Sequence, residues 1–232
     1  MALNVRMPIA GAPNLATPLK VGVLISGRGS NLQALIDACR DDAMPAQIVT
    51  VISNNEDAAG LGRARQAGIA TQIVNHQDFA DRASFDTVLD RALRDAGANF
   101  VCLAGFMRLL TRDFVTAWRD RMINIHPSLL PAFPGLDTHA RVLAAGAKFA
   151  GCSVHFVRFE TDTGPIIVQA AVPVRADDTP DALAARVLEA EHRAYPLALR
   201  LVAEGRVRVV DERAIVEAPP PAPEFILNPP GA

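Results

Sequence analysis

Short apolar runs alternate with amphipathic stretches along the chain from Lys20 onward. The apolar runs predict buried strands over Val21–Ser26, Gln47–Ser53, Thr71–Asn75 and Asn99–Ala104. The stretches between them carry apolar residues at helical spacing, which predicts helices over Asn31–Arg40, Asp57–Gly68 and Phe85–Ala96. Strands that alternate with helices are typical of parallel sheets. The pattern therefore predicts a single-domain α/β fold, a mostly parallel twisted sheet with helices on both faces.

The second half of the chain is less regular. A helix is expected near Arg112–Arg119, and the Pro-rich segment Met122–Gly135 is expected to be a long loop that begins as a short strand. Further on, the pattern predicts helices over Thr138–Ala147 and Pro180–Glu204, and strands over Ser153–Phe159 and Ile166–Val174. A last apolar run, Val207–Val210, is expected either to add an edge strand or simply to cover the core. Pro196 is expected to kink or split the helix that contains it.

Composition favours one domain without a membrane span. The chain has 232 residues, half of them hydrophobic, and polar residues interrupt every apolar run before it reaches the roughly 18 residues of a membrane helix. We expect a flexible leader over 1–19, a catalytic domain over 20–211 and a Pro-rich tail over 212–232. The leader makes a poor secretory signal, and three widely spaced cysteines suit a reducing compartment, so we expect a cytoplasmic protein.

Charge argues against a nucleic-acid partner. The 23 basic residues are scattered among 25 acidic ones, and the net charge is -2. No stripe of Lys and Arg is available to follow a phosphate backbone. The cysteines and histidines form no pattern that favours a metal site.

A glycine-rich turn follows the first predicted strand. Gly27, Arg28, Gly29, Ser30 and Asn31 lead directly into a helix, so backbone N–H groups and the helix dipole would point at a ligand above the strand end. The spacing matches neither a dinucleotide fingerprint nor a P-loop, which favours a single phosphate. The alternative is a tight turn in which Ser30 serves only as the N-cap.

A second group of polar residues suggests acyl transfer. Asn124 and His126 lie on one face of a short strand, and Asp162 lies on a Gly-Pro turn downstream. A carboxylate beside the imidazole favours its charged form. A cationic imidazole and an amide N–H can stabilise the oxyanion of a tetrahedral intermediate, and the substrate can bring its own amine as nucleophile. His139 is a second candidate acid or base, whereas His155 and His192 are expected to be structural.

These motifs, in this order, resemble the phosphoribosylglycinamide formyltransferase family of purine biosynthesis. The resemblance covers roughly Lys20–Val210. It rests on four strings: Leu-Ile-Ser-Gly-Arg-Gly-Ser-Asn from Leu24, Leu-Ala-Gly-Phe-Met-Arg from Leu103, Asn-Ile-His-Pro-Ser-Leu-Leu-Pro from Asn124, and Asp-Thr-Gly-Pro from Asp162. The Asn-x-His-Pro-Ser-Leu-Leu-Pro string is shared by several folate-dependent formyl-transferring enzymes.

The resemblance implies a role for each part of the site. Asn124, His126 and Asp162 would be catalytic, and Gly29, Ser30 and Asn31 would bind the substrate phosphate. Glu191 would face the glycinamide part of the substrate, glycinamide ribonucleotide. The residues implied for the co-substrate 10-formyltetrahydrofolate are Arg82, Met107, Arg108, Leu109, Leu110 and Asn124. No metal is implied, and the enzyme is expected to be a monomer or a homodimer.

Three positions depart from the family pattern. Arg28, Asp137 and Thr163 stand where bacterial members commonly have Asn, His and Gly, which leaves the chemistry intact but alters loop shape and substrate contacts. Formyltetrahydrofolate hydrolases and methionyl-tRNA formyltransferases resemble this domain but carry further domains for which we expect no room here. A module that only binds a sugar phosphate would leave Asn124, His126 and Asp162 without a purpose.

Overall fold

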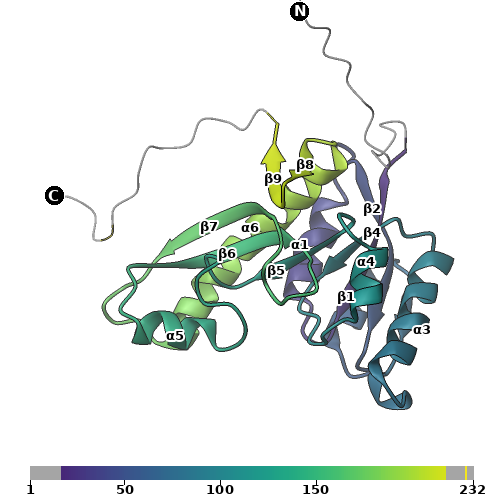
Figure 1. The fold of residues 1–232 in the computed structure, drawn as a ribbon, viewed down its shortest axis with the longest axis horizontal. Helices are drawn as coiled ribbons and strands as arrows, with labels where there is room; N and C mark the ends of the chain where they lie inside the picture. Colours follow the sequence, from purple (N-terminus) through teal and green to yellow (C-terminus); the bar gives the residue numbers. More distant parts are fainter. Residues whose placement is uncertain (1–16, 218–227, 229–232) are drawn as a thin grey trace, which may run out of the picture.

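The computed structural model describes residues 17–217 and 228. Most of the expected leader, and the tail from Ala218 apart from Asn228, lie outside the described residues. The described chain forms a seven-stranded sheet with helices packed on it and a separate two-stranded hairpin (Figure 1). The strands are β1 (Leu19–Ile25), β2 (Ala46–Ser53), β3 (Thr71–Ile73), β4 (Phe100–Leu103), β5 (Met122–His126), β6 (Phe149–Phe156), β7 (Ile166–Pro173), β8 (Val207–Val210) and β9 (Arg213–Val216).

Six α-helices connect or cover these strands in the described chain. They are α1 (Ser30–Ala38), α2 (Ala59–Gln66), α3 (Arg82–Asp95), α4 (Arg112–Ala117), α5 (Thr138–Ala144) and α6 (Pro180–Ala203). The strand order is β3-β2-β1-β4-β5-β6-β7, with β1 to β5 parallel and the last two strands antiparallel. The predicted α/β fold with a mostly parallel sheet is confirmed.

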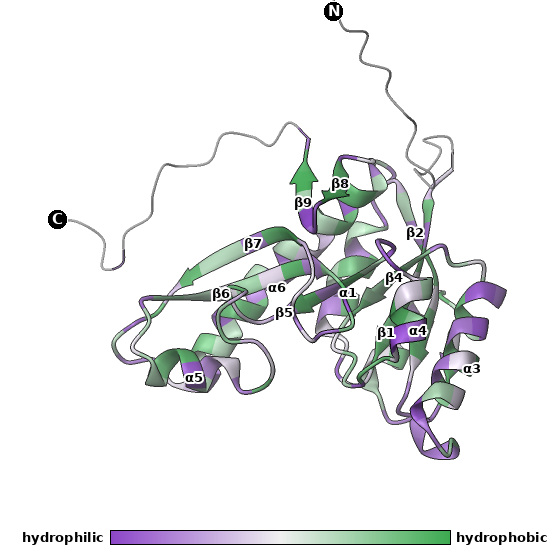
Figure 2. Cartoon of the chain, viewed as in Figure 1, coloured by the Kyte–Doolittle hydropathy of each residue, from purple (hydrophilic) through white to green (hydrophobic). Residues whose placement is uncertain are grey.

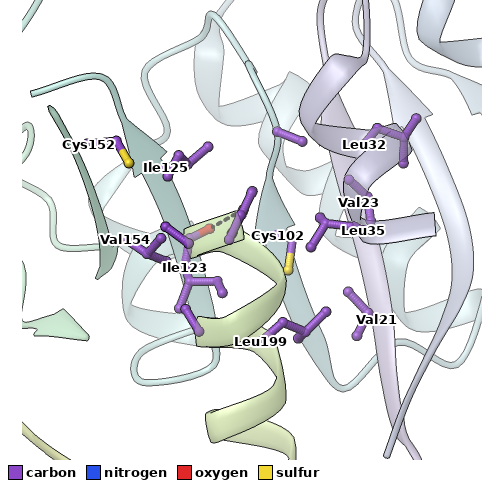
Figure 3. Packing of buried hydrophobic residues seen from close by; sticks show 14 of the residues in the cluster. Val21, Val23, Leu32, Leu35, Cys102, Ile123, Ile125, Cys152, Val154 and Leu199 are labelled. Atoms are coloured by element: carbon purple, nitrogen blue, oxygen red, sulfur yellow. Dashed lines mark hydrogen bonds between the residues drawn. The ribbon is translucent and has the colours of Figure 1, made fainter. Parts of the chain in front are cut away.

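The sheet is buried on both faces because its strands alternate between two cores. In β1, Val21, Val23 and Ile25 belong to one apolar cluster, while Leu24 belongs to the other. Figure 3 shows the first cluster, in which residues of β1, β4, β5 and β6 meet α1 and α6. The second cluster packs the opposite face against α3 and α4. Figure 2 shows the matching pattern on α3, where hydrophilic and hydrophobic positions alternate along the helix. This two-faced burial explains why the parallel strands read as continuous apolar runs.

Three expectations are corrected by the structure. Helix α6 continues past Pro196 without interruption, so the predicted split is wrong. Strand β6 begins at Phe149, four residues before the predicted start, because Phe149–Cys152 pairs with the end of β7. Strand β9 (Arg213–Val216) was not predicted, and it lies within the segment expected to be a tail. It pairs antiparallel with β8 and forms the hairpin.

Tyr195 fixes α6 to the centre of the sheet. Its side chain is fully buried, and its hydroxyl lies 3.0 Å from the Leu103 carbonyl oxygen and 3.3 Å from that of Ile123. These carbonyls belong to the neighbouring strands β4 and β5, which also lead into the polar residues described below. The hydroxyl therefore joins a helix to the two strands that position the candidate site.

Tyr195→Phe should lower the free energy of unfolding by about 1–2 kcal/mol, because it removes a buried hydrogen bond without changing the shape of the core. Urea denaturation monitored by circular dichroism measures the change. Leu197→Ala on the same helix, where the side chain is 48% exposed, should change the free energy by less than about 0.5 kcal/mol. Equal stability of Tyr195→Phe and the unsubstituted protein would contradict this role.

Candidate active site

The polar motifs gather where three adjacent parallel strands end. The order β1-β4-β5 places the glycine turn after β1, the segment Ala104–Leu110 after β4, and His126 at the end of β5 along one edge of the sheet. Ligands of open α/β sheets bind at this edge. Strand β6 runs antiparallel to β5 and ends opposite Ile123, and the turn after it extends far enough to bring Asp162 to His126 and His155.

The glycine turn has a shape that only glycine accommodates. Gly29 adopts φ +71°, and a Cβ atom there would lie 2.6 Å from the Gly60 Cα atom at the start of α2. The Gly60 N–H donates a hydrogen bond to the Gly27 carbonyl oxygen at 3.0 Å, which holds the turn against α2. The turn thus depends on two glycines in direct contact.

No side chain caps the N-terminus of α1. Gly29 occupies the N-cap position and Ser30 is the first helical residue, so the interpretation of Ser30 as an N-cap is wrong. An uncapped N-terminus leaves N–H groups available to an anion.

Asn31 and Glu191 form a buried pair beside this turn. Asn31 Nδ2 donates to Glu191 Oε2 at 2.6 Å, and Glu191 is 7% exposed. Burial raises the pKa of the Glu191 carboxyl, an effect that the Asn31 hydrogen bond partly offsets. Asn31 Oδ1 is buried and has no partner among the described residues, so it can accept a hydrogen bond from a ligand.

Asp162 holds both His126 and the loop that follows β5. Its Oδ2 atom lies 3.4 Å from His126 Nδ1 and accepts a hydrogen bond from the Gly135 N–H at 2.8 Å. The other ring nitrogen, Nε2, lies 3.1 Å from the Phe133 carbonyl oxygen. Both nitrogens face an acceptor, an arrangement that suits a doubly protonated ring because the neutral ring has only one N–H.

Asn124 is oriented by His155, which lies opposite it in the β5–β6 pairing. Burial lowers the pKa of His155, so the ring is neutral near pH 7. His155 Nδ1 lies 2.9 Å from the Phe156 carbonyl oxygen and is therefore the protonated nitrogen. The unprotonated Nε2 atom then accepts a hydrogen bond from Asn124 Nδ2 at 3.3 Å. One N–H of the amide remains for a ligand.

The loop after β5 is fixed by a buried hydroxyl. Ser153 Oγ donates to the Ser128 carbonyl oxygen at 2.7 Å and accepts from the Leu130 N–H at 3.0 Å. Gln169 Nε2 donates to the same hydroxyl at 2.8 Å. The Leu130–Pro131 peptide bond is cis. This part of the Pro-rich segment is therefore an ordered framework rather than a free loop.

A cavity of about 140 Å³ opens beside Asn124, His155 and Asp162. Its other lining residues come from the segment after β4, from α4, and from the end of β6 with the following turn: Leu103, Phe106, Arg108, Leu109, Leu110, Val115, Val157, Arg158, Phe159 and Thr161. Seven of the thirteen lining residues are apolar and six are polar or charged, so the cavity offers both apolar contact and hydrogen-bonding groups to a small molecule.

The predicted folate-binding residues divide into two groups. Arg108, Leu109, Leu110 and Asn124 line this cavity. Met107 is 65% exposed and does not line the cavity. Its N–H donates to Ser26 Oγ at 2.8 Å, which connects the segment after β4 to the residue that follows β1. Arg82 is the first residue of α3 and is also absent from the lining.

Sequence reasoning missed several residues of the cavity. His155 was expected to be structural, and Arg158 and Phe159 were not singled out. The only local signal for His155 was its position in an apolar strand, which does not reveal a cross-strand partner 31 residues away.

The three departures from the family pattern lie on exposed turns. Arg28 is exposed, and its carbonyl oxygen accepts from Arg63 Nε at 3.0 Å. Asp137 precedes α5 with φ +54°, and Thr163 Oγ1 donates to the Glu160 carbonyl oxygen at 2.9 Å. None of these contacts touches Asn124, His126 or Asp162.

No group of three or more His, Cys, Asp or Glu side chains within residues 17–217 and 228 is arranged to hold a metal ion. Over the same residues, no helix combines the length and the apolar character needed to cross a membrane.

Comparison with known proteins agrees with this geometry. The model of the formyl transferase family matches residues 19–199. The chain therefore belongs to the formyl transferase family.

Individual relatives show which enzymes of this family the chain is similar to in sequence and structure. The chain is 47% identical over 196 residues to the phosphoribosylglycinamide formyltransferase of Escherichia coli K12, covering 84% of this chain and 92% of that one. The crystal structure of glycinamide ribonucleotide transformylase 1 from Symbiobacterium toebii superimposes with a TM-score of 0.85 at 47% identity, covering 89% of this chain and 99% of that one. Within the family, the chain groups with the phosphoribosylglycinamide formyltransferases.

A third relative is much longer. The trifunctional purine biosynthetic protein adenosine-3 of Bos taurus is 53% identical over 190 residues, which cover 82% of this chain but 19% of that protein. The chain thus spans about a fifth of that relative.

His155 should remain neutral at pH 7, with its proton on Nδ1. Burial lowers its pKa below 6.5 in the folded state, so the unfolded chain takes up this proton first as the pH falls, and the contribution of His155 to stability decreases below about pH 6.5. Long-range ¹H–¹⁵N NMR distinguishes the tautomers, with His155→Gln as the assignment control. Imidazolium shifts for His155 at pH 7 would contradict the proposed orientation of Asn124.

Proposed function

We propose that this chain transfers the formyl group of 10-formyltetrahydrofolate to the amine of 5'-phosphoribosylglycinamide, giving formylglycinamide ribonucleotide in purine biosynthesis. The observation that carries the proposal is the meeting of Asp162 with His126 beside a cavity lined by Asn124. The similarity to phosphoribosylglycinamide formyltransferases over most of the chain supports it.

The apolar part of the cavity wall would contact the ring system of the folate donor. Leu109 and Leu110 line it, and Asn124 lies beside them to meet the formyl group. Met107 and Arg82 would contact the donor outside the cavity, and Arg108 lies at its wall. Apolar walls also exclude water, which competes with the amine for the formyl carbon.

The phosphorylated substrate would lie between the glycine turn and α6. Gly29, Ser30 and Asn31 offer uncapped backbone N–H groups and polar side chains to the phosphate. Glu191, held by Asn31, would face the glycinamide part. Asn31 hydrogen-bonds Glu191, so the glycine turn that would bind the phosphate is connected to the carboxylate that would face the amine.

The chemistry requires donors that face the oxygen of the formyl group as negative charge develops there. The free N–H of Asn124 is one donor, and His126 is the other. His126 Nε2 now faces the Phe133 carbonyl oxygen, which the substrate oxygen would replace. In this scheme the charged ring would be the donor with Asp162 as its counter-ion, and a water would carry the proton from the attacking amine to the departing folate nitrogen. No metal takes part in this scheme, and we propose a cytoplasmic enzyme that acts as a monomer or a homodimer.

Deformylation of 10-formyltetrahydrofolate should require glycinamide ribonucleotide. Ultraviolet absorbance follows the loss of the formyl group with and without the amine substrate, and mass spectrometry identifies the formylated product. Deformylation at the same rate without the amine would indicate a hydrolase instead. Binding of the ribonucleotide without turnover would indicate a module that only binds a sugar phosphate.

His126→Ala should lower kcat by about 10²–10⁴-fold, because it removes a charged donor from the transition state. The KM for glycinamide ribonucleotide should stay nearly unchanged, since the phosphate contacts lie at the glycine turn. His139→Ala is the comparison, since His139 is the other candidate acid or base, and its kcat should fall far less. A comparable loss in both variants, or equal losses in turnover and substrate affinity, would count against the role of His126.

A further inference from the structure

The β8–β9 hairpin presents a carboxylate toward the main sheet. Asp211 and Glu212 form its turn, both with positive φ, at +49° and +57°. Two consecutive residues in this conformation are required by the tightest hairpin turns, where Asn-Gly and similar pairs are preferred. The turn places the Glu212 carboxylate next to Arg158, 54 residues earlier in the chain.

The Arg158 side chain is buried, and both of its carboxylate partners come from distant parts of the chain. Its side chain is 8% exposed, its Nε lies 2.6 Å from Glu212 Oε2, and its Nη2 lies 2.7 Å from Asp120 Oδ1. Its Nη1 donates to its neighbour, the Val157 carbonyl oxygen, at 3.1 Å. Arg119 makes a second ion pair with Glu212. A buried guanidinium of this kind depends on its carboxylate partners.

The same arginine belongs to the candidate active site. Arg158 lines the cavity that contains Asn124, His155 and Asp162. Its stem also packs under the turn that carries Asp162, because a Cβ atom at Gly164 would lie 3.2 Å from Arg158 Cγ. Arg158 therefore lies between the hairpin on one side and the Asp162 turn on the other.

We propose that Glu212 is a positioning residue of the active site: through Arg158 it sets the wall of the cavity that takes the formyl donor. This inference rests on the proposed function. Glu212 itself is 55% exposed and the ion pair is open to solvent on that side, so the effect of losing it falls on Arg158. Without Glu212, Asp120 is the one acidic ion-pair partner that the described residues leave to the guanidinium, and its position in the cavity wall is no longer fixed.

A double-mutant cycle with Glu212→Gln and Arg158→Met tests whether the two residues act as one unit. In steady-state assays, Glu212→Gln should raise the KM for 10-formyltetrahydrofolate about threefold to tenfold, with kcat and the KM for glycinamide ribonucleotide within about twofold of their original values. In the Arg158→Met background, Glu212→Gln should have no further effect. Glu212→Asp, which keeps the charge, should restore part of the affinity.

The matched control is Glu204→Gln. Glu204 also pairs with an arginine next to the hairpin, Arg206, at 3.1 Å, but neither residue lines the cavity. This variant should leave both KM values unchanged. A similar rise of the donor KM in Glu204→Gln, or additive effects in the double mutant, would overturn the proposal.

A second measurement does not depend on turnover. Hydrogen exchange of residues 159–164 should become faster in Glu212→Gln than in Glu204→Gln, because the Asp162 turn loses its support. Unchanged exchange together with an unchanged donor KM would refute the positioning role while the unsubstituted enzyme remains active. Failure of the proposed function is distinguishable, because the unsubstituted protein itself would then show no formyl transfer.

Discussion

The carboxylate of Asp162 is the contact on which the site depends, because the imidazole of His126 and a backbone N–H of the following loop converge on one of its oxygens. His126 comes from the end of β5, and the Gly135 N–H comes from the loop beyond it. A negative charge that is 8% exposed requires such partners. Orienting the imidazole and closing the loop over it are therefore the same interaction, so a displaced Asp162 would affect both.

The change of direction after β5 determines which residues of β6 meet the site. Five parallel strands bring their carboxyl ends to one edge, where ligands of such sheets bind. Because β6 is antiparallel to β5, it ends opposite Ile123, and the turn that follows extends back until Asp162 lies 3.4 Å from His126 Nδ1 and 3.9 Å from His155 Nε2. The same pairing sets His155 against Asn124, so one reversal supplies the partners of both side chains.

The sequence predicts the elements well where burial alone decides them. The apolar runs of β1 and β2 and the motif from Asn124 to Pro131 indicated the fold and the residues of the site. What it does not contain is cross-strand register: the pairing of His155 with Asn124 depends on how β6 aligns with β5, which no local pattern specifies. Strand β9 was not predicted for a similar reason, because it is only four residues long and is stabilised by pairing with β8.

The continuity of α6 at Pro196 shows tertiary packing outweighing local preference, since the neighbouring Tyr195 and Ala198 are fully buried against the sheet.

Charge burial accounts for the contact between the hairpin and a residue of the cavity wall. Arg158 is the second residue after β6, where Gly164 of the Asp162 turn lies against the end of the strand. Its positive charge also lowers the pKa of His155, although burial is the larger cause. An arginine whose side chain is 8% exposed requires carboxylate partners. Asp120 supplies one from the turn after α4, and Glu212 supplies the other from the hairpin. Apolar residues of both strands already pack the hairpin against the core, and Glu212 adds an ionic contact with an arginine that also lines the cavity.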